Sequence, residues 1–132
     1  MKQPILFVAS IFLLLLNTSC EKAAKIHLIS AQTWVVTEIS SGFSNFANVG
    51  DELTFHDNRL FFSYSNGAES DGRWEFEGSQ TSPFAPATVE GLSITAGFGA
   101  YSFSILTLDN NELKIQDITN FGSPIYSMKA KE

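Results

Sequence analysis

Residues Gly72 to Glu77 read Gly-Arg-Trp-Glu-Phe-Glu, and in them large apolar side chains alternate with charged ones. Trp74 and Phe76 occupy every second position, and the charged Arg73, Glu75 and Glu77 occupy the alternate positions. Successive side chains of a β-strand point to opposite faces of the sheet, so this pattern predicts a strand with one buried and one solvated face.

The same alternation recurs along the chain and defines eight predicted strands. They are short and are separated by stretches rich in Gly, Ser and Asn, and no helical period longer than one turn follows residue 30. The predicted strands span residues 34–39, 53–55, 60–64, 72–77, 92–97, 101–108, 113–116 and 126–132. The sequence therefore predicts an all-β domain in which most strands pair with their neighbours in the chain.

The connection before the third strand sets the predicted orientation of that strand. Asp57-Asn58 is expected to form a tight two-residue turn, because Asn tolerates the positive φ of hairpin turns. Leu60, Phe62 and Tyr64 are then expected to face inward. Residues 65–71 are predicted to form a polar loop.

Two later segments are expected to be irregular. The phase of the longest strand changes at Ile105-Leu106, so that Leu106 and Leu108 continue its apolar face, which is typical of a β-bulge. The segment 78–91 contains Pro83 and Pro86 and cannot pair as a regular strand throughout.

Eight strands with one apolar face each must curl to bury that face, as a closed barrel or as two packed sheets. Closure also removes exposed strand edges, which favours a small eight-stranded antiparallel up-and-down barrel. The interior is expected to include Trp34, Phe55, Phe62, Trp74, Phe103 and Met128.

A largely apolar run from Ile5 to Leu16 follows Lys2 and precedes Cys20, the only cysteine. A charged start, a short apolar centre and a small-residue end are typical of a cleaved secretory signal. With the cysteine directly after it, the segment resembles a bacterial lipoprotein signal, which implies that Cys20 is acylated and begins the mature chain. The alternatives are an ordinary cleaved signal that leaves a free thiol, or an uncleaved anchor.

These features divide the chain into a signal peptide at 1–19, a lipidated tether at 20–31 and a barrel domain at 32–132. One turn of helix is expected near residues 26–29 of the tether. The lipid on Cys20 implies attachment to a membrane of the bacterial cell envelope, on its periplasmic or surface face.

Removal of the signal takes away Lys2, one of the 8 basic side chains. The remaining 7 basic and 14 acidic side chains give a net charge of −7. An acidic chain without a basic cluster argues against nucleic acid as a partner. A single cysteine provides neither a disulfide framework nor a cysteine metal cluster.

Short motifs in a set order make residues 31–131 resemble the lipocalin-like domains of small bacterial lipoproteins. The motifs are Trp34, Leu53-Thr54-Phe55, Gly72-Arg73-Trp74, Tyr101 to Leu108, Glu112 to Ile115 and Ile125 to Met128. The resemblance implies a cup-shaped eight-stranded barrel that binds a small apolar molecule. It also implies a buried arginine at one end, although Arg59 and Arg73 both occupy outward positions near turns and are expected on the surface.

Catalytic chemistry is not expected. The two histidines are His27, in the tether, and His56, beside a turn, and no metal-ligand spacing accompanies them. Glu75 and Glu77 alternate with buried positions and are expected in solvent. No nucleophile, base and oxyanion site can be assembled, so the sequence predicts no enzyme, no metal and no cofactor.

The candidate binding residues are phenylalanines in polar loops. In an up-and-down barrel the loops at 40–51, 65–71, 96–100 and 119–124 share one end, and they carry Phe43, Phe46, Phe98 and Phe121. These rings either form an apolar rim that binds a small ligand or a partner, or fold inward and plug the barrel.

Two functional classes follow: a tethered cup for a small apolar ligand, and a module that binds another envelope protein through its loops. The packing of the interior distinguishes them, because a filled barrel has no room for a ligand.

Overall fold

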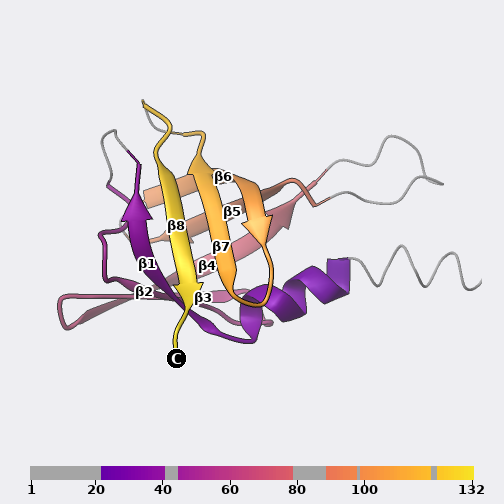
Figure 1. Ribbon diagram of the computed structural model, residues 1–132, viewed down its shortest axis with the longest axis horizontal. Helices are drawn as coiled ribbons and strands as arrows, with labels where there is room; N and C mark the ends of the chain where they lie inside the picture. The colour runs from indigo at the N-terminus through magenta and orange to yellow at the C-terminus, as the bar shows by residue number, and fades with distance from the viewer. Residues whose placement is uncertain (1–21, 41–44, 79–88, 98, 120–121) are drawn as a thin grey trace, which may run out of the picture.

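The computed structural model describes residues 22–40, 45–78, 89–97, 99–119 and 122–132, which include all eight strands of one closed antiparallel barrel (Figure 1). Each strand pairs with its neighbours in the chain, and β1 pairs with β8 to close the barrel. The strands are β1 (Thr33–Ile39), β2 (Glu52–Phe55), β3 (Leu60–Ser65), β4 (Ala68–Glu77), β5 (Gly91–Ala96), β6 (Gly99–Leu108), β7 (Glu112–Asp117) and β8 (Ile125–Ala130). The predicted all-β, up-and-down barrel is confirmed.

A helix at residues 22–30 precedes β1 and is longer than the single turn expected there. Ile29 is fully buried in the core and Ile26 packs against it, so the helix buries one side on the barrel. The Ser30 hydroxyl donates to the Ile26 carbonyl at 2.6 Å at the C-terminal end of the helix. The Trp34 indole N–H then donates to the Ile29 carbonyl at 2.9 Å, which joins the helix to β1.

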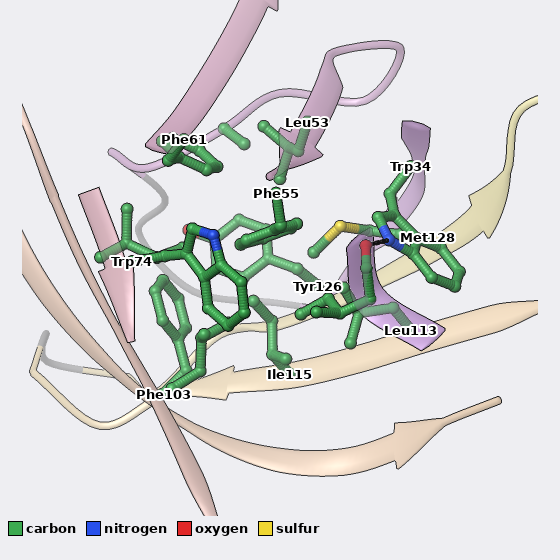
Figure 2. Close-up of a cluster of buried hydrophobic side chains, with 14 of the residues drawn as sticks. Trp34, Leu53, Phe55, Phe61, Trp74, Phe103, Leu113, Ile115, Tyr126 and Met128 are labelled. Atoms are coloured by element: carbon green, nitrogen blue, oxygen red, sulfur yellow. Dashed lines mark hydrogen bonds between the residues drawn. The ribbon is translucent and has the colours of Figure 1, made fainter. Parts of the chain in front are cut away.

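The barrel interior is built from alternate side chains of every strand (Figure 2). Trp74 and Phe76 of β4 are buried and Glu75 and Glu77 are exposed, as their alternation predicts. The Trp74 indole donates to the His56 carbonyl at 2.7 Å, so its polar atom is satisfied inside the core. Trp34, Phe55, Phe103 and Met128 are also fully buried, as expected.

The prediction for β3 was wrong: Phe61 and Ser63 face inward, whereas Leu60 and Tyr64 are exposed and Phe62 is half-buried. The reason is the length of the preceding turn. Arg59 adopts φ 74° and extends the turn to three residues, 57–59, which the hydrogen bond from the His56 N–H to the Leu60 carbonyl closes; the Arg59 N–H donates to the His56 carbonyl. Phe55 therefore pairs with Phe61, and a one-residue shift reverses the faces of the whole strand.

The predicted loop at 65–71 is instead a tight hairpin. Asn66 and Gly67 have φ values of 51° and 83° and form a two-residue turn, after which β4 begins at Ala68. Asn-Gly is the pair that such a turn favours, because both positions need positive φ.

The predicted β-bulge in β6 is present, as the register with β7 shifts between Ile105 and Thr107. Leu108 is half-buried and packs against the core, but Leu106 is 46% exposed, so the inward orientation expected for Leu106 was wrong. A second shift, between Val36 and Glu38, interrupts the pairing of β1 with β8.

The two arginines, Arg59 and Arg73, differ in how far their side chains are exposed. Arg73 is exposed, as expected, whereas Arg59 is only partly exposed and its guanidinium lies 5.2 Å from the centre of the Trp74 ring. This cation–π contact lies at the end of the barrel where β2 turns into β3.

Candidate binding site at the loop end of the barrel

The antiparallel order of the strands divides the connections between two ends. The connections at 40–51, 66–67, 97–98 and 118–124 share one end, which we call the loop end, as predicted. The other end, which we call the closed end, receives the connections at 56–59, 78–90 and 109–111. It also receives the helix at 22–30, where Lys25 donates to the Val89 carbonyl at 3.5 Å.

Phe46 lies inside the barrel mouth and is only 5% exposed. Its ring centre lies 4.8 Å from that of Phe103, 5.2 Å from Tyr101, 5.4 Å from Tyr126 and 6.3 Å from Phe61. For this residue the structure therefore matches the inward-folding alternative. Phe43, Phe98 and Phe121, the other predicted rim residues, lie outside the described residues, as does Cys20.

The centre of the barrel is filled. An enclosed space that could hold even a water molecule would leave accessible surface on the side chains around it. The following side chains have none: Trp34, Leu53, Phe55, Phe61, Phe103, Leu113, Ile115, Tyr126 and Met128 (Figure 2). The packing therefore leaves no room for a ligand between them.

A half-open pocket of about 170 Å³ lies at the loop end, between the β1–β2 connection and the β3–β4 hairpin. We call it the serine pocket. One wall is the inner face of the hairpin, and the other is the loop that places Phe46 in the barrel. Its lining residues are Asn45, Phe46, Ala47, Asn48, Asp51, Ser63, Ser65 and Ser70.

The loop wall is held by a turn at residues 48–51. The Asp51 N–H donates to the Asn48 carbonyl at 3.1 Å, and Gly50 has the φ of 95° that the third residue of a type II turn requires. The Asp51 carboxylate accepts from the Asn48 N–H at 2.8 Å through Oδ2. Asp51 is only 6% exposed, so this carboxylate is positioned by the backbone around it.

The hairpin wall exists because small polar residues replace large apolar ones there. Phe61 and Trp74 end the apolar part of β3 and β4, and beyond them Ser63 and Ser70 pair across the two strands. Ser63 is 6% exposed, yet its hydroxyl has no hydrogen bond among the described residues. No described side-chain nitrogen or oxygen is both sealed from solvent and unpaired, so this hydroxyl opens onto the pocket.

Sequence reasoning missed the serine pocket because it gave β3 the wrong face. With the correct face, Ser63, Ser65 and Ser70 occupy inward positions at a period of two. Polar residues at that period on an otherwise apolar face were the available signal.

Two further polar residues, Tyr101 and Asp117, lie at the loop end. Burial and, to a lesser degree, the nearby Asp117 carboxylate raise the pKa of the Tyr101 hydroxyl above 10.0. That hydroxyl donates to the Asn45 carbonyl at 3.3 Å, and Asp117 accepts from the Thr119 N–H at 2.8 Å. A proton held on Tyr101 maintains the contact between β6 and the loop wall of the serine pocket.

A wider depression of about 350 Å³ involves Glu77, Glu90, Ser104 and Ile118. It is more open than the serine pocket.

The histidines do not combine with other groups into a reactive site among the described residues. His27 is exposed on the helix, and His56 is exposed with its ring edge-on to Phe62 at 5.2 Å. The described part of the chain holds no group of three His, Cys, Asp or Glu side chains that could bind a metal ion. Within that part, no helix has the length and apolar character needed to cross a membrane.

Comparisons of the chain with protein-family profiles, with curated proteins and with solved structures find no match.

Proposed function

We propose that the chain is a non-catalytic binding module of the bacterial cell envelope that engages its target at the loop end and is tethered through lipid on Cys20. The packing of the interior carries this proposal. Side chains with no accessible surface fill the barrel, which favours binding outside the barrel over storage of an apolar molecule within it.

The distribution of exposed apolar side chains also supports the loop end as the binding surface. Val49 and Ile118, at that end, are 63% and 59% exposed and are the most exposed large apolar side chains of the described residues. Contiguous exposed apolar patches mark surfaces that bind a partner, and Val49 and Ile118 would each supply apolar contacts to such a surface.

The tether rests on the sequence before Cys20, which resembles a lipoprotein signal. Two or more acyl chains hold a protein on a membrane stably, whereas one gives marginal binding. A multiply acylated Cys20 leaves only a short stretch before the helix at 22–30, which packs on the closed end. The loop end then faces away from the membrane, toward other components of the envelope.

Position-dependent photo-crosslinking in intact cells tests the proposal. A diazirine amino acid is introduced at Val49 or at Ile118, and a matched control carries it at Leu106, which is 46% exposed near the end of β6 at the closed end. We expect a discrete crosslinked product from both loop-end positions and none from Leu106. Equal products at all three positions, or a product from Leu106 alone, would contradict the proposal.

An apolar dye provides the complementary measurement. If the barrel interior is filled, the purified chain should give no saturable increase in the fluorescence of a solvatochromic dye. Stoichiometric uptake with submicromolar affinity would instead favour the apolar-ligand alternative.

A further inference from the structure

We propose that the serine pocket binds one neutral, polyhydroxylated six-membered ring, such as a single sugar residue of a glycan. The inference rests on the proposed function, because it names the chemistry of a target at the loop end.

The size of the serine pocket fits one ring. A cavity of about 150 Å³ holds a benzene molecule, and the serine pocket measures about 170 Å³. Because the pocket is half-open, a substituent on the ring, or the next residue of a glycan, can extend into solvent. A whole steroid or fatty acyl chain is too large to be enclosed by it.

The polar groups of the serine pocket match hydroxyl groups. The Ser63 side chain is almost fully buried, and its hydroxyl makes no hydrogen bond to the described residues but opens onto the pocket, where a ligand hydroxyl can pair with it. Ser65 and Ser70 line the same wall, and Asn45 and Asn48 stand at the opening. Hydroxyl and amide groups both donate and accept, which suits a ligand that carries several adjacent hydroxyls.

Asp51, the acidic side chain among the described lining residues, narrows the class of ligand. Asp51 Oδ2 accepts from the Asn48 N–H, while Oδ1 has no partner among the described residues and can accept from a ligand hydroxyl. A hydrogen bond to a carboxylate is stronger than one between neutral groups. The described lining residues include no Lys or Arg, which disfavours an anionic ligand. Apart from Asp51, the polar side chains among them are neutral, which favours a neutral ring over an organic cation.

Phe46 completes the serine pocket. Its ring is packed on four other aromatic rings, and the residue, which is 5% exposed, lines the pocket. The ring of a sugar has apolar C–H groups between its hydroxyls, and an aromatic side chain can contact them while the serines bind the hydroxyls.

The test uses nitrogen-15 NMR titration of the full-length chain, in a detergent that lacks a sugar headgroup. The probes are the methyl pyranosides of glucose, galactose, mannose and N-acetylglucosamine. Cyclohexanol controls for ring size without adjacent hydroxyls, and cyclohexylammonium tests for a cation site. We expect at least one glycoside to bind saturably with Kd of roughly 1 mM and to shift the amides of Ser63, Ser65 and Ser70.

Variants localise the binding. Ser63→Ala and Asp51→Asn are each expected to weaken it at least tenfold, since a site built to bind hydroxyls loses affinity when one partner is removed. Asp51→Asn keeps an oxygen that can accept from the Asn48 N–H, so the turn is retained. Ser93→Ala, on the outer wall of β5, is the matched control and should leave Kd unchanged.

The outcomes separate this inference from the proposed function. Binding of cyclohexylammonium but of no glycoside would overturn the inference in favour of a cation site. No shift with any probe up to about 100 mM would mean that the pocket holds water only. A glycoside affinity unchanged in Ser63→Ala would also overturn it. Under each of these results the proposed function still stands if Val49 and Ile118 crosslink while Leu106 does not.

Discussion

Trp74 illustrates how a single residue combines several stabilising contacts. It is 2% exposed, donates its indole N–H to the His56 carbonyl and packs edge-on against Phe55 and Phe76. Arg59 covers the ring from outside. The neighbouring Glu75 points into solvent on the same strand.

We therefore predict that Trp74→Ala lowers the free energy of unfolding by about 3 to 5 kcal/mol, the cost of truncating a large buried aromatic residue. Glu75→Ala should change it by no more than about 0.5 kcal/mol, because its side chain is exposed. Urea titrations of both variants measure the difference. Equal effects would mean that the faces of β4 are assigned wrongly.

Among the elements, the helix at 22–30 differs most from its prediction, because it is longer than one turn and packs on the barrel. The sequence predicts a tether with a single turn of helix there, yet Ile29 is fully buried and Ile26 packs beside the core. Hydrogen bonds from Lys25 to Val89 and from Trp34 to Ile29 hold the helix against the closed end. The apolar pattern in the sequence is weak because only one side of this short helix contacts the barrel.

Replacement of Ile29 by alanine tests whether the helix contributes to the core. We expect Ile29→Ala to lower the free energy of unfolding by about 2 to 5 kcal/mol, as for other buried isoleucines. His27→Ala, at an exposed position of the same helix, is the control and should stay within about 0.5 kcal/mol. Thermal melts that show equal small losses for both variants would indicate that the helix does not contribute to the core.

At the scale of the whole molecule, the closed end and the loop end differ in the residues that they carry. The closed end carries the helix, the two indole hydrogen bonds and the Arg59 contact. The loop end carries the serine pocket and the most exposed apolar side chains. The proposed tether at Cys20 would lead into the closed end and leave the loop end available for binding.

The tether itself is tested by Cys20→Ser. We predict that the wild-type chain begins at Cys20, carries acyl mass there and partitions with membranes, because multiple acyl chains anchor stably. The variant should lose the acyl mass and appear as a soluble or unprocessed product. Intact-protein mass spectrometry and membrane fractionation measure both properties, and a soluble wild type with a free thiol would disprove the lipid anchor.

The sequence by itself determined the strand count, the up-and-down order and most inward positions. Apolar and polar side chains alternate within each strand, so the sequence of a strand shows which of its faces is buried. Trp74 and Phe76 are the clearest case. The β-bulge at Ile105 was also readable, since a bulge changes the phase of the period.

Only the tertiary structure decided the features that depend on register or on distant contacts. One extra turn residue, Arg59, reversed the faces of β3 and placed Ser63 in the interior. Phe46 reads locally as a loop aromatic, but four rings from β3, β6 and β8 surround it. The local sequence pattern shows which side of a strand is apolar. The closed barrel determines what fills the space that those sides enclose, and that space decides between storing a ligand and binding one at the rim.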